Sequence, residues 1–267
     1  MTPGRKAILV VGGASGIGQA LIQGFPASAY EVTLWDTRPG EADGGAVVDR
    51  QTIDITDRGA VAHALAALTA RRVRFHAVVV SAGVHATCPV EQMPDTLLDL
   101  VMNVNFLAHV RLVRDLIPMV QPGGRIIGVS SIAAAVGIPM SSAYSASKAA
   151  LESFYESLAI ELRRKRIWPV VVRPGNVNTG FNETGNQVAG NGDAELTEAH
   201  RRVVDMIHSR HGMPAEQVAQ VIRKAIDAPR PRFCYVVGQN AQRATWAKRI
   251  LGPDLALMLL RRHFGFR

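Results

Sequence analysis

The stretch KAILVVGGASGIG, from Lys6 to Gly18, decides the fold. Lys6 to Val11 is a short apolar run rich in β-branched residues, which predicts a buried strand. The glycine turn from Gly12 to Gly18 follows, and a helical pattern then continues to about Phe25. A strand, a glycine turn and a helix N-terminus form an anion site made of backbone N–H groups. The segment therefore predicts a nucleotide-binding βα unit, although an ordinary βα turn has a similar pattern.

The three glycines of the turn would each serve a different purpose. Gly12 permits the tight turn, Gly16 lets the backbone approach a pyrophosphate, and Gly18 lets the helix pack against its strand. This division of roles strengthens the prediction of a dinucleotide site.

The second predicted strand, Tyr30 to Trp35, ends at Asp36 and bears on the choice of cofactor. A carboxylate at this position can bond both ribose hydroxyls of an adenosine and would repel a 2′-phosphate. Arg38 is the counter-signal, because a guanidinium could accommodate that phosphate. Ser15 is not basic, which removes one place for a phosphate-binding cation. The pattern favours NAD over NADP.

Composition bounds the class of protein. The chain has 267 residues, of which 48% are apolar and 19% charged, so we expect one α/β domain over residues 1–267. No apolar run approaches the roughly 18–20 residues of a membrane span. The net charge of +8 comes mostly from scattered arginine pairs without interleaved aromatic residues, which argues against a nucleic-acid partner. Cys88 and Cys234 stand alone, so we expect a cytoplasmic protein with no metal site.

Strands and helices alternate along the chain, which predicts a Rossmann-like, doubly wound parallel sheet in three layers. A third strand is expected to end at Asp54, which could contact an adenine amine or cap the following turn. The remaining predicted strands are 75–80, 125–129, 168–172 and 233–237.

The segment from Ser130 to Lys148 carries the groups suited to proton transfer. Helix signals begin around Ser141 and Ser142 and continue to Leu162, so Tyr144 and Lys148 would share one helix face. The nearby ammonium and the helix dipole would both favour the phenolate. A phenol that ionises easily, next to the Ser131 hydroxyl, can exchange a proton with a carbonyl or alcohol oxygen.

Two further segments have features of a site. Helical spacing runs from Pro94 to Val120, and Asn105 in its interior predicts a local irregularity that holds a water, or else a tolerated polar position. Residues 181–212 are expected to act as a substrate lid, because the segment beginning at Phe181 is rich in glycine and asparagine.

These motifs together resemble the short-chain dehydrogenase/reductase family, in its compact single-domain branch. The resemblance covers about Lys6 to Gly238, and six motifs agree in order and spacing. They include Gly12-xxx-Gly16-x-Gly18, Asn105, Ser131, Tyr144-xxx-Lys148 and Pro174-Gly175-x-Val177-x-Thr179.

The resemblance implies an NAD(P)-dependent alcohol dehydrogenase or ketoreductase, and it implies roles for single residues. Tyr144 would be the general acid/base, Ser131 would orient the substrate oxygen, Lys148 would bind the ribose, and Asn105 would hold a water. The implied cofactor contacts are Gly12, Ser15, Gly16, Ile17, Gly18, Asp36, Asp54, Ile55, Ala82, Gly83, Tyr144, Lys148, Pro174, Gly175, Val177 and Thr179; the implied substrate contacts are Ser131, Tyr144 and Phe181.

Three positions depart from the family pattern. Val11 stands where threonine is usual, Ser81 where asparagine is usual, and His76 where aspartate is common. All three are supporting positions, so the departures affect structural detail more than the family assignment.

Apolar residues around the expected lid suggest a bulky hydrophobic substrate of steroid, polyketide or acyl type: Val84, Ile132, Val136, Met140 and Phe181. A non-catalytic NAD(P)-binding sensor or scaffold is the alternative. The C-terminal extension, residues 239–267, is predicted to form two basic amphipathic helices. They could dock a membrane or a partner, but packing in a homodimer or homotetramer is the preferred expectation.

Overall fold

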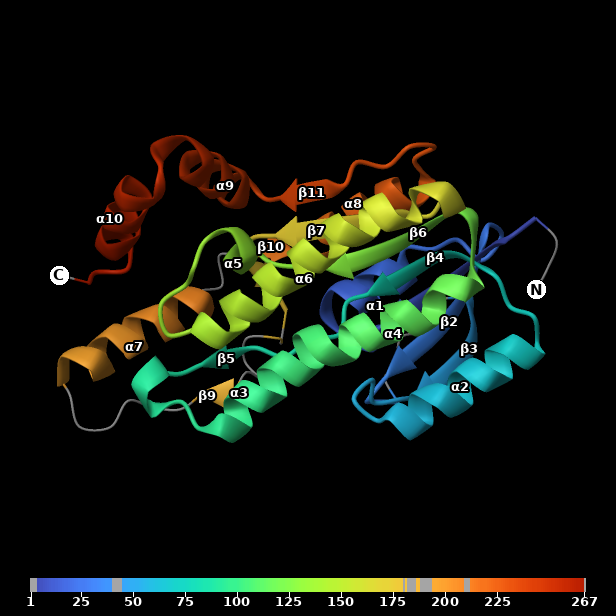
Figure 1. Cartoon of the computed structure of the whole chain (residues 1–267), viewed down its shortest axis with the longest axis horizontal. Helices are drawn as coiled ribbons and strands as arrows, with labels where there is room; N and C mark the ends of the chain where they lie inside the picture. Colours follow the sequence, from blue (N-terminus) through green and yellow to red (C-terminus); the bar gives the residue numbers. More distant parts are fainter. Residues whose placement is uncertain are drawn as a thin grey trace.

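A seven-stranded parallel sheet forms the centre of the computed structural model (Figure 1). The structure describes residues 4–39, 45–179, 181, 186–187, 194–208 and 212–266. The strand order is β11-β7-β6-β4-β1-β2-β3, and every pair is parallel. Strands are added to one side of β1 up to β3 and to its other side from β4 onward, so the topological switch point lies between β1 and β4. This arrangement creates a crevice at the carboxyl ends of these two strands. The predicted Rossmann-like sheet is confirmed. The strands are β1 (Lys6–Val11), β2 (Tyr30–Asp36), β3 (Val47–Thr52), β4 (Phe75–Val80), β6 (Val120–Val129), β7 (Trp168–Pro174) and β11 (Cys234–Val237).

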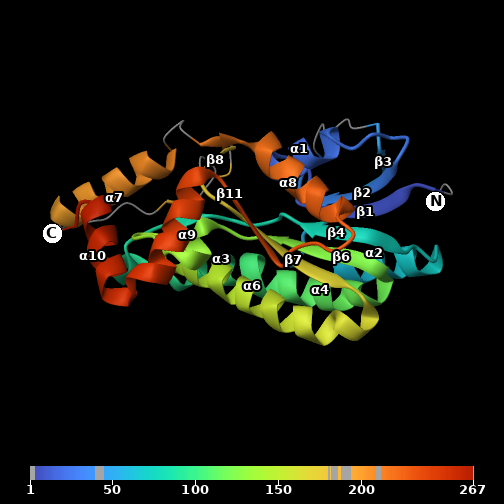
Figure 2. The same ribbon diagram turned by 90° about the horizontal axis from the view of Figure 1, so that it is seen from above.

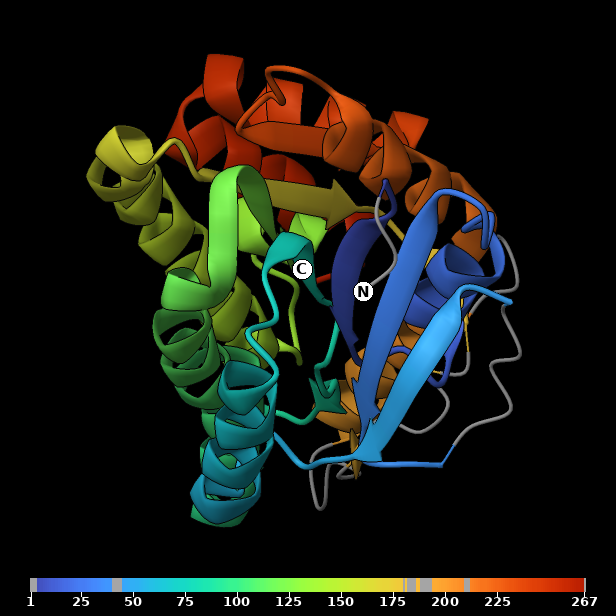
Figure 3. The same cartoon turned by 90° about the vertical axis from the view of Figure 1, so that its right-hand side faces the viewer.

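Helices cover both faces of the sheet (Figures 2 and 3). On one face α1 (Gly16–Gln23) and α8 (Ala215–Asp227) bury apolar residues such as Leu21 and Ile222. On the other, α2 (Arg58–Ala70), α4 (His109–Leu116) and α6 (Ser142–Glu161) do the same with Leu68, Leu112 and Tyr155. The strands are therefore apolar on both sides, as their continuous hydrophobic runs require.

The helix expected from Pro94 to Val120 is interrupted where the sequence suggested it. It comprises α3 (Asp95–Met102), a π-helical stretch η2 (Asn103–Ala108), α4, and a short 3-10 turn η3 (Ile117–Met119). The irregularity expected at Asn105 is thus confirmed. Among the described residues, this is the one helical stretch long and apolar enough to cross a membrane. It packs into the sheet through fully buried Leu112 and Leu116.

The C-terminal part adds helices at one corner of the molecule. Helices α9 (Gln239–Leu251) and α10 (Pro253–His263) lie at one end of the molecule in Figures 1 and 2, and the predicted basic helices are present. Leu260 of α10 and the following Phe264 pack on Val203 of α7 (Ala194–His208). Within the expected lid, residues 182–185, 188–193 and 209–211 lie outside the described part of the chain. The short elements are β5 (Ala86–Thr87), η1 (Val90–Gln92), α5 (Ile132–Ala135), η4 (Leu162–Lys165), β8 (Val177–Asn178), β9 (Asn186–Gln187) and β10 (Met213–Pro214).

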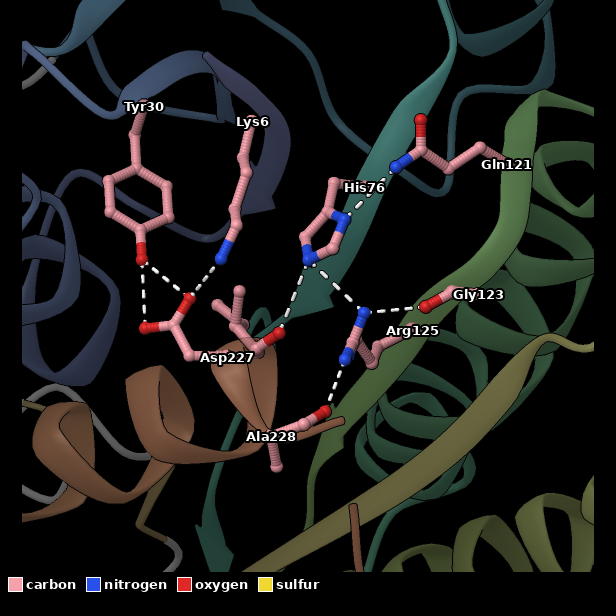
Figure 4. A network of polar contacts seen from close by, with 9 residues as sticks. Lys6, Tyr30, His76, Gln121, Gly123, Arg125, Asp227 and Ala228 are labelled. Carbon is pink, nitrogen blue, oxygen red and sulfur yellow. Dashed lines mark hydrogen bonds and ion pairs between the residues drawn. The ribbon is translucent and has the colours of Figure 1, made fainter. Parts of the chain in front are cut away.

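A polar network joins the amino ends of the strands, at the edge opposite the crevice (Figure 4). Asp227 at the end of α8 accepts from the Lys6 ammonium (2.6 Å) and the Tyr30 hydroxyl (2.7 Å). Nearby, His76 Nε2 lies 3.1 Å from the Arg125 guanidinium, which can only donate. Burial and this cation lower the pKa of His76, so the imidazole is neutral and accepts the bond.

Candidate functional site

One cavity of about 840 Å³ opens at the carboxyl ends of β1, β2, β4, β6 and β7. Asp36 lies on its wall at the end of β2, and Ser131 and Tyr144 lie on the wall beyond β6. The cavity brings together most residues singled out in the sequence: Gly12, Ser15, Gly16, Ile17, Asp36, Asp54, Ile55, Ala82, Gly83, Ser131, Tyr144, Lys148, Pro174, Gly175, Val177, Thr179 and Phe181. Gly18 and Asn105 are not on its wall.

The glycine turn fits a dinucleotide because it leaves no room for side chains at its base. Gly12 has a φ of +81°, and a Cβ built there would lie 2.5 Å from the Ala82 amide nitrogen. A Cβ on Gly18 would lie 2.1 Å from the Gly12 carbonyl oxygen. The absence of a side chain at Gly18 lets α1 pack closely against the turn, as expected, and the cofactor contact expected of Gly18 stays a prediction. The backbone amides of the turn are left at the mouth of the cavity, where they suit a pyrophosphate.

Asp36 is held in place by two backbone amides. Its carboxylate accepts from Ala14 N–H (2.9 Å) and Arg38 N–H (3.0 Å), and the side chain is largely buried. The Arg38 guanidinium turns across the glycine turn to Ser15 Oγ (2.5 Å) and lies 3.9 Å from the Asp36 carboxylate. A carboxylate and a guanidinium therefore share this end of the cavity, and each offsets part of the other's charge.

Asp54 caps a turn, which is one of its two expected roles, and its contact with an adenine amine stays a prediction. Its carboxylate accepts from the amide and the hydroxyl of Thr56, each at 2.8 Å, so it caps the turn before α2. It also lines the cavity next to Ile55. The third strand itself ends earlier than predicted, at Thr52.

Tyr144, Lys148 and Ser131 converge at the other end of the cavity. Tyr144 and Lys148 lie one turn apart on α6, with the ammonium 5.8 Å from the centre of the phenol ring. The Lys148 ammonium donates to the Val129 carbonyl oxygen (3.0 Å) at the end of β6. Ser131 begins α5, where its hydroxyl accepts from Ala133 N–H (3.2 Å), and it also bonds the Tyr144 phenol. A phenol, a hydroxyl and an ammonium are thus fixed in one wall by two helix starts and one strand end.

The protonation of this group differs from the expectation. Burial raises the pKa of the Tyr144 phenol to about 12, against a smaller lowering by the Ser131 hydrogen bond. Burial also lowers the pKa of Lys148 to about 8. The prediction of an easily ionised phenol considered the ammonium and the helix dipole but not desolvation, which outweighs both here. At neutral pH the phenol carries its proton, the form that can donate to a substrate oxygen.

Asn105 supports the site from behind its wall. The side chain is fully buried; its oxygen accepts from Val84 N–H (2.8 Å), and its amide group donates to the Val84 carbonyl (2.9 Å) and to Ser147 Oγ (3.1 Å). It therefore fixes the strand end after Gly83 against α6. Its side chain does not reach the cavity, so the expected water-holding role stays a prediction.

The cavity contains residues that the motifs did not reveal. His85 is buried, stands edge-on to the Tyr144 ring at 4.7 Å, and its Nε2 lies 3.3 Å from Ser141 Oγ. Ser130 lines the cavity, and its buried hydroxyl finds no partner among the described residues. The cavity wall also includes His263, the last residue of α10, and Phe264, which follows it. Both reach the cavity through the packing of distant elements, so no local sequence pattern indicates them.

The wall near Tyr144 is mostly apolar. Val84, Ile132 and Phe181 line it, as the sequence suggested, and Ile138 and Phe264 join them. Val136 and Met140, expected at the same place, are buried but do not line the cavity. The arrangement can hold an apolar molecule whose one oxygen meets the Tyr144 and Ser131 hydroxyls.

The comparison with known families decides the assignment. The model of the short chain dehydrogenases matches residues 6–189, which is more than half of the chain. This chain belongs to the short-chain dehydrogenase family. Family membership makes it a nicotinamide-dependent oxidoreductase of Rossmann-like fold.

Relatives of this short-chain dehydrogenase cover most of its length. It is 28% identical to 3-ketodihydrosphingosine reductase of Bacteroides thetaiotaomicron over 89% of each chain. It is 31% identical to bovine (Bos taurus) retinol dehydrogenase 8, over 86% of this chain and 81% of the relative. The crystal structure of a short-chain dehydrogenase from Streptomyces avermitilis superposes with a TM-score of 0.82 at 23% identity, over 98% and 97% of the two chains.

The departures of this short-chain dehydrogenase from its family pattern have structural explanations. Ser81 donates its hydroxyl to the Gly12 carbonyl oxygen (3.2 Å), so it still ties the end of β4 to the glycine turn. Val11 is buried in the apolar core and makes only backbone hydrogen bonds to this region, accepting from Ser81 N–H (2.8 Å). His76 belongs to the network of Figure 4, far from the cavity.

Proposed function

We propose that the chain reduces a ketone, or oxidises the corresponding secondary alcohol, with NAD(H) and a bulky hydrophobic substrate. The observation that carries the proposal is the convergence of Ser131, Tyr144 and Lys148 on one wall of a cavity that also contains Asp36. When bound, the nicotinamide cofactor supplies or takes up the hydride. All other steps fall to side chains of the chain itself.

The protein's own groups handle the substrate oxygen. In reduction, the protonated Tyr144 phenol donates its proton to the carbonyl oxygen while the Ser131 hydroxyl holds the same atom. The Lys148 ammonium, anchored on the Val129 carbonyl, supports the phenolate that results and binds a ribose hydroxyl. Asn105 positions the strand end behind them. The high pKa of Tyr144 supports proton donation at neutral pH.

The preference for NAD rests on Asp36. The carboxylate is fixed at the cavity wall by Ala14 and Arg38 amides, so it cannot turn away from a 2′-phosphate. Arg38 would attract that phosphate, but its guanidinium is already bonded to Ser15 and lies beside the carboxylate. Titration of the protein with NADH and NADPH tests the preference: we expect NADH to bind more tightly, and tighter NADPH binding would overturn it.

The apolar wall supports a lipid-like ketone as substrate. Two of the relatives above are named for 3-ketodihydrosphingosine and retinol, which are both long and apolar. A panel of steroid, acyl-chain and small polar ketones, assayed by NADH and NADPH oxidation, tests this. We expect turnover to increase with the apolar area of the ketone. Cofactor binding without turnover of any ketone would instead favour the non-catalytic sensor, and fastest turnover of small polar ketones would refute the substrate class.

The proposal includes the organisation of the chain. Residues 1–267 form one domain in which 181–212 close over the substrate and 239–267 are an extension; Phe181 on the cavity wall supports the first. We also propose a cytoplasmic homodimer or homotetramer. Exposed apolar side chains on the α6 side, such as Leu107 and Ile160, support an interface between copies there. Light scattering tests the assembly, and a monomer at assay concentration would contradict it.

A further inference from the structure

Exposed apolar side chains are concentrated on the two C-terminal helices. Trp246 on α9 is 70% exposed and Leu257 on α10 is 59% exposed. Six of the fourteen exposed large apolar side chains in the described part of the chain lie between Gln239 and His263: Trp246, Ile250, Leu255, Leu257, Met258 and Leu259. Scattered apolar residues on a surface need no explanation, but a concentration of this kind indicates an interaction site.

One apolar face of α10 packs on the body of the protein, and a second one is exposed. Ala256 and Phe264 are buried and Leu260 is partly buried; Leu260 and Phe264 pack with Val203 of α7 and Ile138. Leu255, Met258, Leu259 and Arg262 follow the spacing i, i+3, i+4 and i+7, so they form one stripe on the opposite side of the helix. Helix α10 thus has two apolar faces, one of which nothing in the described structure covers.

Helix α9 repeats this arrangement. Ala241 is its buried residue, whereas Arg243, Trp246 and Ile250 follow the spacing i, i+3 and i+7 on an exposed face. A tryptophan, an isoleucine and an arginine on one face match the composition of helices that lie in a membrane interface. In Figures 1 and 2 the two helices stand at a corner of the molecule, so the rest of the chain would not obstruct a flat partner.

Charge selects among the possible occupants. The exposed cations of α9 and α10 are Arg243, Lys248, Arg249, Arg261 and Arg262, against a single acid, Asp254. No ion pair within the described residues engages Arg243, Lys248, Arg249 or Arg262. A symmetric contact between two copies, the arrangement expected from the sequence, would bring the same excess of cations from both copies into one interface. An anionic bilayer satisfies the apolar and the cationic groups together.

We propose that α9 and α10 form a docking face for the surface of an anionic lipid membrane. The exposed side chains of Trp246, Ile250, Leu255, Met258 and Leu259 enter the headgroup boundary, and the cations engage lipid phosphates. Because His263 and Phe264 line the cavity, the docked helix also forms part of the cavity wall. The docking itself does not depend on the proposed activity.

Co-sedimentation of the full chain with vesicles tests the proposal. The probes are vesicles of phosphatidylcholine alone and vesicles in which about a third of the lipid is phosphatidylserine. We expect binding to the anionic vesicles that is at least about tenfold tighter and that weakens with added salt. On docking, Trp246 fluorescence should shift to the blue, and Trp246→Phe should abolish the shift.

Two variants with matched controls separate the docking face from general surface effects. Arg243→Glu with Arg262→Glu, which changes the cations on the two exposed stripes, should reduce binding at least about tenfold. The control, Arg163→Glu with Arg164→Glu in the exposed turn η4 after α6, should not change it. Leu255→Gln with Met258→Gln and Leu259→Gln should also abolish binding, and Val48→Gln on β3 (56% exposed in the wild type) should not. If the triple variant fails to fold, the charge pair decides alone.

Three results would overturn the proposal. The first is no binding of the wild type to anionic vesicles. The second is equal loss of binding in the variants at 163 and 164. The third is conversion of an oligomer to a monomer by the substitutions on α10 with unchanged vesicle binding, which would make this face an interface between copies.

Discussion

Alanine substitutions at three glycines test the geometry of the nucleotide turn. Gly18 has an ordinary helical backbone, but a Cβ there would lie 2.1 Å from the Gly12 carbonyl oxygen. Gly123 has a φ of +85° and nothing within 4 Å of a Cβ. Gly12 combines both problems, with a φ of +81° and a Cβ 2.5 Å from the Ala82 nitrogen. The three variants therefore separate collision from backbone strain.

The magnitudes follow from these environments. Gly123→Ala should lower the free energy of unfolding by about 1–2 kcal/mol, the cost of a left-handed residue with a Cβ. Gly18→Ala gains up to about 1 kcal/mol of helix propensity but must push α1 away from backbone atoms, so we expect a net loss of about 3 kcal/mol. Gly12→Ala should lose about the sum of the two, on the order of 4–5 kcal/mol.

Urea unfolding measures the stabilities, and fluorescence titration with NADH measures cofactor binding. Gly18→Ala and Gly12→Ala should weaken NADH binding at least about tenfold, because the anion-binding amides move, whereas Gly123→Ala should leave it unchanged. The reasoning is refuted if Gly18→Ala is as stable as the wild type and binds NADH equally well, or if Gly123→Ala is the more damaging change.

Two further predictions concern titrating groups near the site. His109 hydrogen-bonds Tyr155 (2.9 Å), and burial lowers its pKa to about 3. Below the ordinary histidine pKa of about 6.5, the unfolded chain binds a proton at this residue and the folded chain does not. The free energy of unfolding therefore falls as the pH drops from about 6.5 towards 3. Between pH 7 and 5 the wild type should lose roughly 2 kcal/mol more than His109→Gln in urea unfolding, and parallel losses would contradict this. Glu152 raises the pKa of Lys148 and forms an ion pair with Arg173. Glu152→Gln should therefore lower the pKa of Lys148 below 8 and move the alkaline limb of the pH profile of kcat/KM to lower pH. An alkaline limb that does not move would rule out the effect of Glu152 on Lys148.

The sequence predicted the parts of the fold that depend on local pattern. The run from Lys6 to Val11, the glycine turn and Asp36 each have a short-range signal, and they meet because parallel strands end at one edge. The Tyr144–Lys148 pair could be predicted because helix periodicity fixes neighbours one turn apart. The π-helical stretch at Asn105 followed from a polar residue in an apolar helix.

Features that depend on packing between distant elements could not be predicted. Phe264 reaches the cavity only because α10 packs on α7, and no spacing in the sequence encodes that contact. Arg38 turning to Ser15 depends on the rotamer of a long side chain. The pKa of Tyr144 depends on how completely the fold removes water around it, which the neighbouring residues in the sequence do not determine.

The rate of ketone reduction by Tyr144→Phe tests the central claim most directly. Removing one hydroxyl leaves the ring packing and the cavity intact but takes away the proposed proton donor. With the best ketone of the panel, we expect kcat to fall by about 10²–10⁴-fold while the affinity for NADH stays within about threefold. A variant that reduces the ketone at the wild-type rate would contradict the assignment of Tyr144 as the acid of the reaction.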